Sequence, residues 1–241
     1  MSGQILYIDP KDKDPQSTVR VIHYFSTTST EVPQEEVGGR GAYGSKYQAE
    51  AIVEHPDIAD IFYTFSGLHG KAGTWALYRL DLRQFNPVHA STTRKAEKLI
   101  DVPEAIWLNG ATMIPQTSTL LTANSPQGKL CAFNLHTRKI STWLQDAELG
   151  KVTTRPPWPG INGLQYFRGY IFGTVSDCGT LLRMQVDKDG DYKNGSLEIT
   201  AMQLTGNDMA LDCEGNAYVA TNPAQTVLKF AGMGIEIGSR K

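Results

Sequence analysis

The sequence predicts an all-β protein, and more narrowly a β-propeller. Helical periodicity is nearly absent, short β-rich runs are broken by Gly, Asn, Asp and Pro, and one strand pattern recurs about every 50 residues. Many short strands with frequent turn residues are typical of all-β folds. A period of this length, holding three or four strands, is typical of propeller blades. We therefore expect a single propeller domain over residues 1–241.

Composition and charge narrow the class of protein. The 241 residues are 40% hydrophobic and 20% charged, which is enough for one sizeable core. The formal net charge of −2 gives no electrostatic basis for binding nucleic acid or an anionic membrane. No apolar run approaches the roughly 20 residues of a membrane-spanning helix. The N-terminal residues lack the pattern of a signal peptide, so we expect a cytoplasmic protein.

The cysteines indicate neither a metal site nor a disulfide framework. Cys131, Cys178 and Cys213 are odd in number and far apart, and no C-x-x-C pair is present. Zinc and thioredoxin-like functions are therefore excluded, and we expect three small strand residues.

Runs rich in β-branched and aromatic residues predict the strands in chain order. They cover residues 60–67, 74–82, 118–125, 129–135, 139–145, 170–176, 180–186 and 216–222. Two stretches favour helix instead: a short amphipathic piece over 45–56 and a single turn over 145–151. Residues 26–50, rich in Ser, Thr, Gly and Glu, predict a flexible loop, either a solvated connector or a lid.

One alternating strand pattern recurs five times. It begins at Ile5, Leu77, Leu130, Leu181 and Val227, and the last three steps are 53, 51 and 46 residues. The first copy lacks the strand before it and the last lacks the strands after it, which leaves roughly four and a half blades. Because an open propeller exposes sheet edges, we expect a propeller that is incomplete at both ends, tightly arranged, or completed by a partner.

Polar residues recur with the same period at the entrances of the expected inner strands. They are Asn109, Asn162 and the pair Asn207 and Asp208, and the intervals of 53 and 46 residues match the strand period. Inner strands of a propeller line one channel, so these side chains are expected to converge on its axis. The alternative is that each caps its own loop in an Asx turn.

The stretch before the middle strand suggests why an amide stands there. Gly160 and Gly163 flank Asn162, and we expect them to let the backbone bend so that Asn162 points into the channel. The preceding "PPWP" is expected to stiffen the approach and to bring Trp158 near the channel mouth.

The segments "LNGAT", "PGINGLQ" and "GNDMALDCEGNAYVATNP", preceded by "AIVEHPDIADIFYTFSG", occur in an informative order. Together they resemble the gluconolactonase and senescence-marker superfamily of six-bladed propellers, and most closely its fungal branch. The resemblance covers roughly residues 50–230. It implies six blades.

For the lactonases of that superfamily, the resemblance implies a divalent metal held by a Glu, an Asn and an Asp. Asn162 and Asp208 match metal ligands, and Asn109 matches an amide beside the substrate. Oxygen ligands suit Ca²⁺, which would polarise a lactone carbonyl and activate water. The family's Glu belongs to a strand upstream of the segment resembling "GQILYIDP", and no Glu stands at a matching place in this sequence.

The fungal branch also implies an activity that needs no metal or other cofactor. It includes hetero-Diels–Alderases of terpenoid secondary metabolism, which join a tropolone-derived quinone methide to a sesquiterpene such as humulene. Holding the two reactants together lowers the barrier by several kcal/mol. Hydrogen bonds to the quinone methide carbonyl lower it further. We expect Asn109, Asn162 and Asp208 to exchange those hydrogen bonds.

Further side chains are expected to bind such a substrate. They are the aromatic residues Trp107, Trp158 and Tyr166, together with Asn207 and His69. The alternative for the aromatic residues is packing between blades, and for His69 an exposed loop position. No Ser-His-Asp order, P-loop or dinucleotide fingerprint is present in the sequence.

Three functions follow in order of preference. The first is a hetero-Diels–Alder cyclase acting on a polyketide or terpenoid substrate. The second is a metal-dependent lactonase, and the third is a propeller that binds a small molecule without turning it over.

Overall fold

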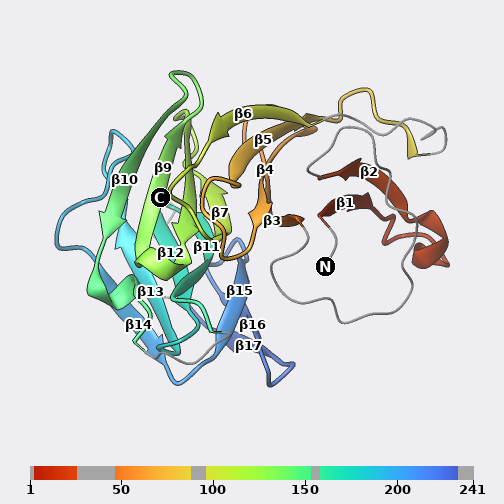
Figure 1. Ribbon diagram of the computed structural model, residues 1–241. Coiled ribbons are helices and arrows are strands. Elements are labelled where there is room, and N and C mark those ends of the chain that lie inside the picture. Colours follow the sequence, from red (N-terminus) through yellow and green to blue (C-terminus); the bar gives the residue numbers. More distant parts are fainter. Residues whose placement is uncertain (1–2, 26–46, 88–95, 153–157, 233–241) are drawn as a thin grey trace, which may run out of the picture. The chain divides into compact units, whose positions relative to one another are not determined.

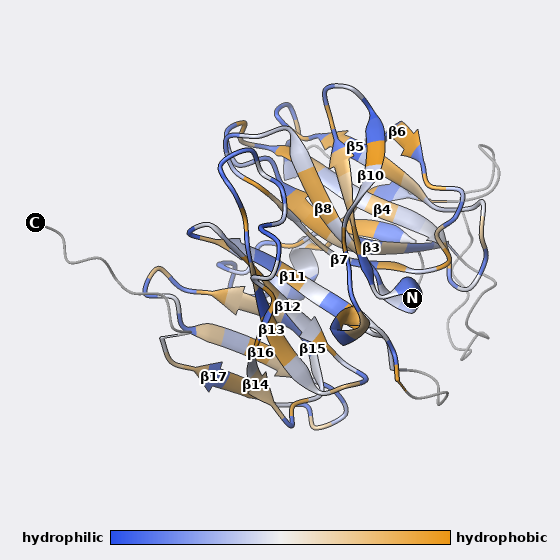
Figure 2. Cartoon of the chain, turned by 90° about the vertical axis from the view of Figure 1, so that its left-hand side faces the viewer, coloured by the Kyte–Doolittle hydropathy of each residue, from blue (hydrophilic) through white to orange (hydrophobic). Residues whose placement is uncertain are grey.

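A computed structural model of the chain describes residues 3–25, 47–87, 96–152 and 158–232, and its strands β1 to β17 are antiparallel (Figure 1). Hydrophobic residues concentrate in the strands, and hydrophilic residues concentrate in the turns between them (Figure 2). The chain divides into two compact units, residues 1–108 and 109–241.

Among the helices in the described ranges, none is long and apolar enough to cross a membrane.

The first unit holds a two-stranded hairpin and one four-stranded blade. The hairpin consists of β1 (Gln4–Tyr7), the 3-10 helix η1 (Pro15–Thr18) and β2 (Arg20–Tyr24). The blade has the order β3 (Tyr47–Glu54), β4 (Ile61–Leu68), β5 (Ala76–Asp81) and β6 (Glu97–Asp101). Ile5, Ile22 and Phe25 of the hairpin segment pack with Leu80 of the blade, so the hairpin covers one face of this sheet.

The second unit holds three blades in succession. The first is β7 (Leu108–Met113), β8 (Thr119–Asn124), β9 (Lys129–Asn134) and β10 (Lys139–Gln145), with η3 (Ser125–Gln127) after β8. The second, after η4 (Ala147–Leu149), is β11 (Ile161–Phe167), β12 (Tyr170–Val175), β13 (Thr180–Gln185) and β14 (Glu198–Met202). The third has only β15 (Gly206–Leu211), β16 (Ala217–Thr221) and β17 (Val227–Phe230).

The first two blades of the second unit each pack against the blade that follows. Leu121, Ala123 and Leu130 form one cluster with Ile161, Ile171, Leu182 and other residues of the β11–β14 blade. Phe172 and Leu181 on the opposite face of that blade form another with Met209, Ala217 and Val219 of the last blade. Apolar side chains on both faces of a middle strand therefore hold successive sheets together.

The blade repeat expected from the sequence is confirmed, and the number of blades is corrected. The strands that begin near Ile5, Leu77, Leu130, Leu181 and Val227 are β1, β5, β9, β13 and β17. The arrangement is that of a β-propeller, but the described residues form four blades and a hairpin in place of the expected six blades. The single domain over residues 1–241 stays a prediction.

The amphipathic helix expected over residues 45–56 is wrong, because Tyr47–Glu54 form strand β3. Gln, Ala and Glu favour helix locally, but pairing with the buried strand β4 overrides a propensity of a few tenths of a kcal/mol per residue. The loop expected over 26–50 accordingly ends earlier, since residues 47–50 belong to β3, and residues 26–46 lie outside the described ranges. The helical turn expected over 145–151 is confirmed as η4.

Candidate functional site

The innermost strand of three blades carries a bulge, where it has one more residue than its partner strand. In β11 the pairing skips from Ile161 to Leu164, in β15 from Gly206 to Asp208, and in β3 from Glu50 to Ile52. Bulges redirect side chains and are common beside active sites. Asn162 and Asn207 are bulge residues, so the backbone irregularity falls at the positions that the sequence singled out.

Asn162 is buried, at 4% exposure, and its amide group bridges two blades of the second unit. Its Nδ2 donates to Ser176 Oγ at 2.9 Å, within its own blade, and to Asn207 Oδ1 at 2.7 Å, in the next blade. The Asx-turn alternative is therefore wrong for Asn162, because its side chain bonds across strands and does not cap its own loop.

The neighbouring hydrogen bonds fix which way the Asn162 amide points. Ser176 Oγ donates its only proton to Gly206 O at 2.6 Å, so toward Asn162 it can only accept. Both N–H groups of Asn162 are thereby used. Its Oδ1 accepts no hydrogen bond from the described residues and is not one of the four buried side-chain polar atoms found without a partner, so solvent reaches it. The amide presents an oxygen, and no N–H, to a ligand.

Asp208 lies against the residue that follows Asn162. A Cβ atom placed on Gly163 would lie 2.5 Å from Asp208 Oδ1 and 2.7 Å from Asp208 Cα. Asp208 Oδ1 accepts from the backbone N–H of Met209 at 2.8 Å. Desolvation by the surrounding protein raises the pKa of Asp208, although much of the residue as a whole stays exposed. A carboxylate that has lost hydration without gaining a cation favours binding one.

The glycines beside Asn162 serve close approach as well as the expected bend, since the chain bends at Gly160 and the pairing of β11 skips from Ile161 to Leu164. Neither Gly160 nor Gly163 has a positive φ. A Cβ atom on Gly160 would lie 2.6 Å from Leu149 O and 2.9 Å from Ser125 O. Both positions lack a side chain because neighbouring backbone occupies the space. Of the "PPWP" segment, Pro156 and Pro157 lie outside the described residues.

Asn109 lies on β7, the inner strand of the blade before the Asn162 bulge. Its neighbour Gly110 packs directly against the backbone of Asn162 and Gly163, and a Cβ atom placed on Gly110 would lie 2.7 Å from Gly163 Cα. Thr122 Oγ1 on β8 donates to Gly110 O at 3.2 Å and holds this strand end. Three successive inner strands therefore place Asn109, Asn162 and Asp208 within one unit, next to one another in strand order.

Replacing Ser176 by Ala tests this network. The change leaves an N–H of Asn162 and the carbonyl of Gly206 without their buried partner, which should lower the free energy of unfolding by about 1–3 kcal/mol. Urea unfolding followed by circular dichroism measures the loss. Ser141→Ala, on the exposed side of β10, is the matched control and should change stability by no more than about 0.5 kcal/mol. Equal stability of the two variants would contradict the bridge.

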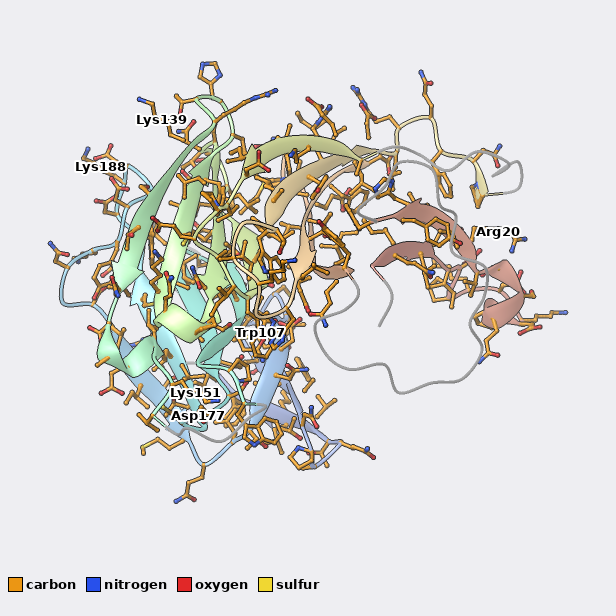
Figure 3. The ribbon with its side chains drawn as sticks, viewed as in Figure 1. Arg20, Trp107, Lys139, Lys151, Asp177 and Lys188 are labelled. Atoms are coloured by element: carbon orange, nitrogen blue, oxygen red, sulfur yellow. The ribbon has the colours of Figure 1, made fainter. Side chains whose placement is uncertain are left out.

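The two aromatic residues of the second unit differ in their roles. The Tyr166 hydroxyl accepts the backbone N–H of Gly169 at 3.1 Å, and the ring packs against the cluster between the first two blades of this unit. Trp158 is half-buried in the segment before β11. The same end of the blade is tied down by Asp177, whose Oδ2 accepts the Val152 N–H at 2.8 Å, and Lys151 and Asp177 lie close together there (Figure 3).

Trp107 and His69 belong to the first unit and contact each other. Their ring centroids are 4.2 Å apart in an edge-to-face arrangement, and burial lowers the pKa of His69. The indole Nε1 of Trp107, labelled in Figure 3, is buried without a hydrogen-bond partner in the described residues. The two residues predicted to bind substrate thus form a pair of their own.

Glu50 is a largely buried acid that the sequence did not reveal. It lies on the inner strand β3 beside the bulged residue Ala51, and Thr64 Oγ1 of β4 donates to its backbone carbonyl at 3.4 Å. Burial raises the pKa of Glu50 to about 7. The sequence did not reveal Glu50 because the composition of residues 26–50 predicts one polar loop. In the structure, strand β3 already begins at Tyr47.

The raised pKa of Glu50 predicts a pH-dependent stability. The folded state binds the Glu50 proton more tightly than the unfolded chain does. The stability that this proton contributes is complete below pH 4.5 and is lost as the pH rises through about 7. Glu50→Gln imitates the protonated form. At pH 8 it should be more stable than the unchanged protein by about 3 kcal/mol, and at pH 4.5 equal to it. Urea unfolding at both pH values measures the difference, and a pH-independent difference would contradict the assignment.

The oxygen atoms of Asn162 and Asp208 are of the chemical type that could hold a hard divalent cation that keeps much of its own water. Asn162 Oδ1 accepts no hydrogen bond from the described residues, and the Asp208 carboxylate is partly desolvated, with no cationic side chain among the causes of its pKa shift. Ca²⁺ and Mg²⁺ prefer such ligands. No group of three or more His, Cys, Asp or Glu side chains suited to a metal occurs within the described ranges. The protein thus contributes few ligands, and weak binding is expected.

No family model matches this chain, and no curated protein matches it. Solved structures of similar fold exist. They include an auxiliary nutrient binding protein from Bacteroides thetaiotaomicron (TM-score 0.60, 12% identity, 97% of this chain and 56% of that chain). A periplasmic gluconolactonase from Pseudomonas aeruginosa is also similar (0.58, 16%, 95% and 58%), as is a luciferin-regenerating enzyme (0.54, 14%, 77% and 59%).

These likenesses establish the fold alone, because the identities are low. They include gluconolactonase-like propellers, as the sequence resemblance predicted. The chain spans 56–59% of the length of these three proteins. The fungal branch of the resemblance stays a prediction.

Proposed function

We propose that this chain binds a divalent cation through Asn162 Oδ1 and the Asp208 carboxylate and hydrolyses a lactone beside it. The observation that carries the proposal is the fixed amide of Asn162, whose two N–H groups are donated to Ser176 and Asn207. An amide locked in this orientation can only accept, and a cation is one ligand that two oxygen acceptors can share. The similar fold of a gluconolactonase supports the same class of reaction.

The chain's own residues would position the reactants. Ser176 and Asn207 hold the Asn162 oxygen in place, and the missing side chains at Gly110 and Gly163 bring the three inner strands close together. Asn109 lies on the neighbouring strand and is the candidate to hydrogen-bond the lactone. A divalent cation, when bound, polarises a carbonyl and makes a bound water more acidic. Ring opening then adds water across the ester C–O bond and releases a hydroxy acid.

The cyclase function expected first from the sequence is supported by no contact in the described residues. A hetero-Diels–Alder cyclase requires side chains that donate hydrogen bonds to the quinone methide carbonyl. Asn162 has no N–H left to donate, and an ionised Asp208 has no proton to give. Asn109, the Nδ2 group of Asn207 and the indole N–H of Trp107 would remain as donors. The hetero-Diels–Alder reaction stays a prediction.

Hydrolysis of glucono-δ-lactone by the purified protein tests the proposal. Acid release is expected with added Ca²⁺, Mg²⁺ or Zn²⁺, and the rate should fall to the uncatalysed value in a chelator and recover when the cation is restored. An undiminished rate in chelator would contradict cation dependence. Turnover of a quinone methide with humulene in chelator would favour the cyclase. Cation binding without turnover of either substrate would favour a non-catalytic propeller.

A further inference from the structure

The last blade presents an open face that its predecessors do not. Tyr218 lies opposite Lys229, and Ala220 lies opposite Val227, so these four side chains share one face of the β15–β17 sheet. The other face, with Val219 and Ala217, is buried against the preceding blade. On the open face Tyr218 is 36% exposed and Val227 is 67% exposed.

The equivalent strand pairs of the earlier blades show that this face lacks a covering sheet. In the two earlier blades of the same unit, the pairs Leu121–Ala132 and Ala123–Leu130, and Phe172–Arg183 and Thr174–Leu181, occupy the same positions. Leu121, Ala123, Leu130, Phe172, Thr174 and Leu181 are all at 0% exposure. The next blade covers Leu121, Ala123 and Leu130 through aliphatic side chains such as Ile161 and Leu182. It covers Phe172 and Leu181 through side chains such as Met209 and Val219. The open face has the sequence pattern of a covered one.

The first unit also has an exposed apolar face, on its hairpin. Alternation along the hairpin puts Ile5 and Ile22 on the side packed against the blade. On the other side, Leu6 lies opposite Val21, and Ile8 and Val19 follow in the same alternation. Leu6, Ile8 and Val19 are 51%, 48% and 39% exposed. Figure 3 shows Arg20 projecting at the outer end of this hairpin.

We propose that the hairpin face of one copy (Leu6, Ile8, Val19, Val21) covers the last-blade face (Tyr218, Ala220, Val227, Lys229) of a second copy. Aliphatic side chains on a sheet are what cover the equivalent positions inside the second unit. Asp9, directly after Ile8, supplies an acid that can meet Lys229 at the edge of the contact. Because the two faces differ, the association is head-to-tail.

The contact is independent of the proposed lactonase activity. A head-to-tail contact makes rings or open chains of copies, so the average mass in solution should rise with protein concentration. Sedimentation velocity of the full chain measures this. A sedimentation coefficient that stays at the monomer value throughout would overturn the proposal.

Charged substitutions locate the contact. Val227→Glu and Leu6→Glu each place a carboxylate in an apolar face, and each should weaken association by about tenfold or more. Ile140→Glu is the matched control, because Ile140 is an exposed isoleucine, at 38%, on the outer strand β10 and on neither face. Equal weakening by Ile140→Glu would contradict the assigned faces.

Cysteine pairing between copies keeps the proposal testable if a charged variant fails to fold. Leu6→Cys and Val227→Cys are made separately in a Cys213→Ser background, which removes the exposed native thiol. Mixing the two and oxidising them should give a disulfide-linked dimer in higher yield than either variant alone. When both cysteines are placed in one dilute chain, an internal disulfide formed in place of the dimer would show that the hairpin of the same copy covers the face, which overturns the proposal.

Discussion

Asp208→Asn should weaken cation binding by about tenfold to a hundredfold and reduce lactone hydrolysis at fixed cation concentration to the same extent. Asp208 supplies the negative charge of the proposed site with Asn162, and the affinity of hard cations rises with ligand charge. Neutralising it removes a charge–charge attraction of one to a few kcal/mol at the effective dielectric of a protein surface. Isothermal titration with Ca²⁺ and the lactone assay measure the two effects.

Asp212→Asn is the matched control for that change. Asp212 lies four residues further on, and its carboxylate serves a turn. It accepts from Asn216 Nδ2 at 2.8 Å and from the backbone N–H groups of Asn216 and Glu214. Hydrogen bonds from Asn216 lower the pKa of Asp212 to about 2. This variant should leave cation affinity within about twofold, and equal losses for the two variants would mean that Asp208 acts through the blade's stability and not as a ligand.

Gly110→Ala should destabilise the second unit by about 2–4 kcal/mol, because a side chain there meets backbone that cannot move aside. Its Cβ atom would overlap the Asn162 carbonyl oxygen and lie 2.7 Å from Gly163 Cα and 2.8 Å from Leu164 N. Overpacking costs typically 1–3 kcal/mol, and more when the obstacle is main chain on two strands. Thermal and urea unfolding measure the change.

Gly169→Ala separates this effect from the ordinary cost of losing a glycine. Gly169 has a φ of +84° in the β11–β12 turn, and a Cβ atom there meets nothing within 4 Å. Its replacement should cost only about 1 kcal/mol, the strain of an L-residue in the left-handed region. If Gly110→Ala lowers the free energy of unfolding by no more than Gly169→Ala does, the close approach of β7 and β11 is contradicted.

The β-strand repeat could be predicted from the sequence because it depends on local chemistry. Alternation of apolar and polar residues and punctuation by glycine turns are visible along the chain, and they located β5, β9, β13 and β17 to within a residue or two. Strand β3 was missed, because Gln48, Ala49 and Glu50 favour helix and the partner that overrides this preference, β4, is found only by pairing.

The strand positions of the candidate site residues were predictable for a similar reason. Asn109, Asn162 and Asp208 recur with the blade period, so their presence on successive inner strands follows from the sequence alone. The number of blades does not follow, and the six expected from resemblance are four in the described residues.

Only the tertiary structure decided what these side chains can do. Whether Asn162 offers an oxygen or an N–H depends on Ser176 and Asn207, which lie 14 and 45 residues away. Gly160 and Gly163 suggested a bend, and the structure adds a second reason for them, which is backbone from other segments within contact distance. The sequence determined where polar residues stand along each blade, because strand periodicity is local. Their hydrogen-bond partners and the close strand contacts are set by neighbours distant in the chain, so only the folded structure determines the chemistry of the site.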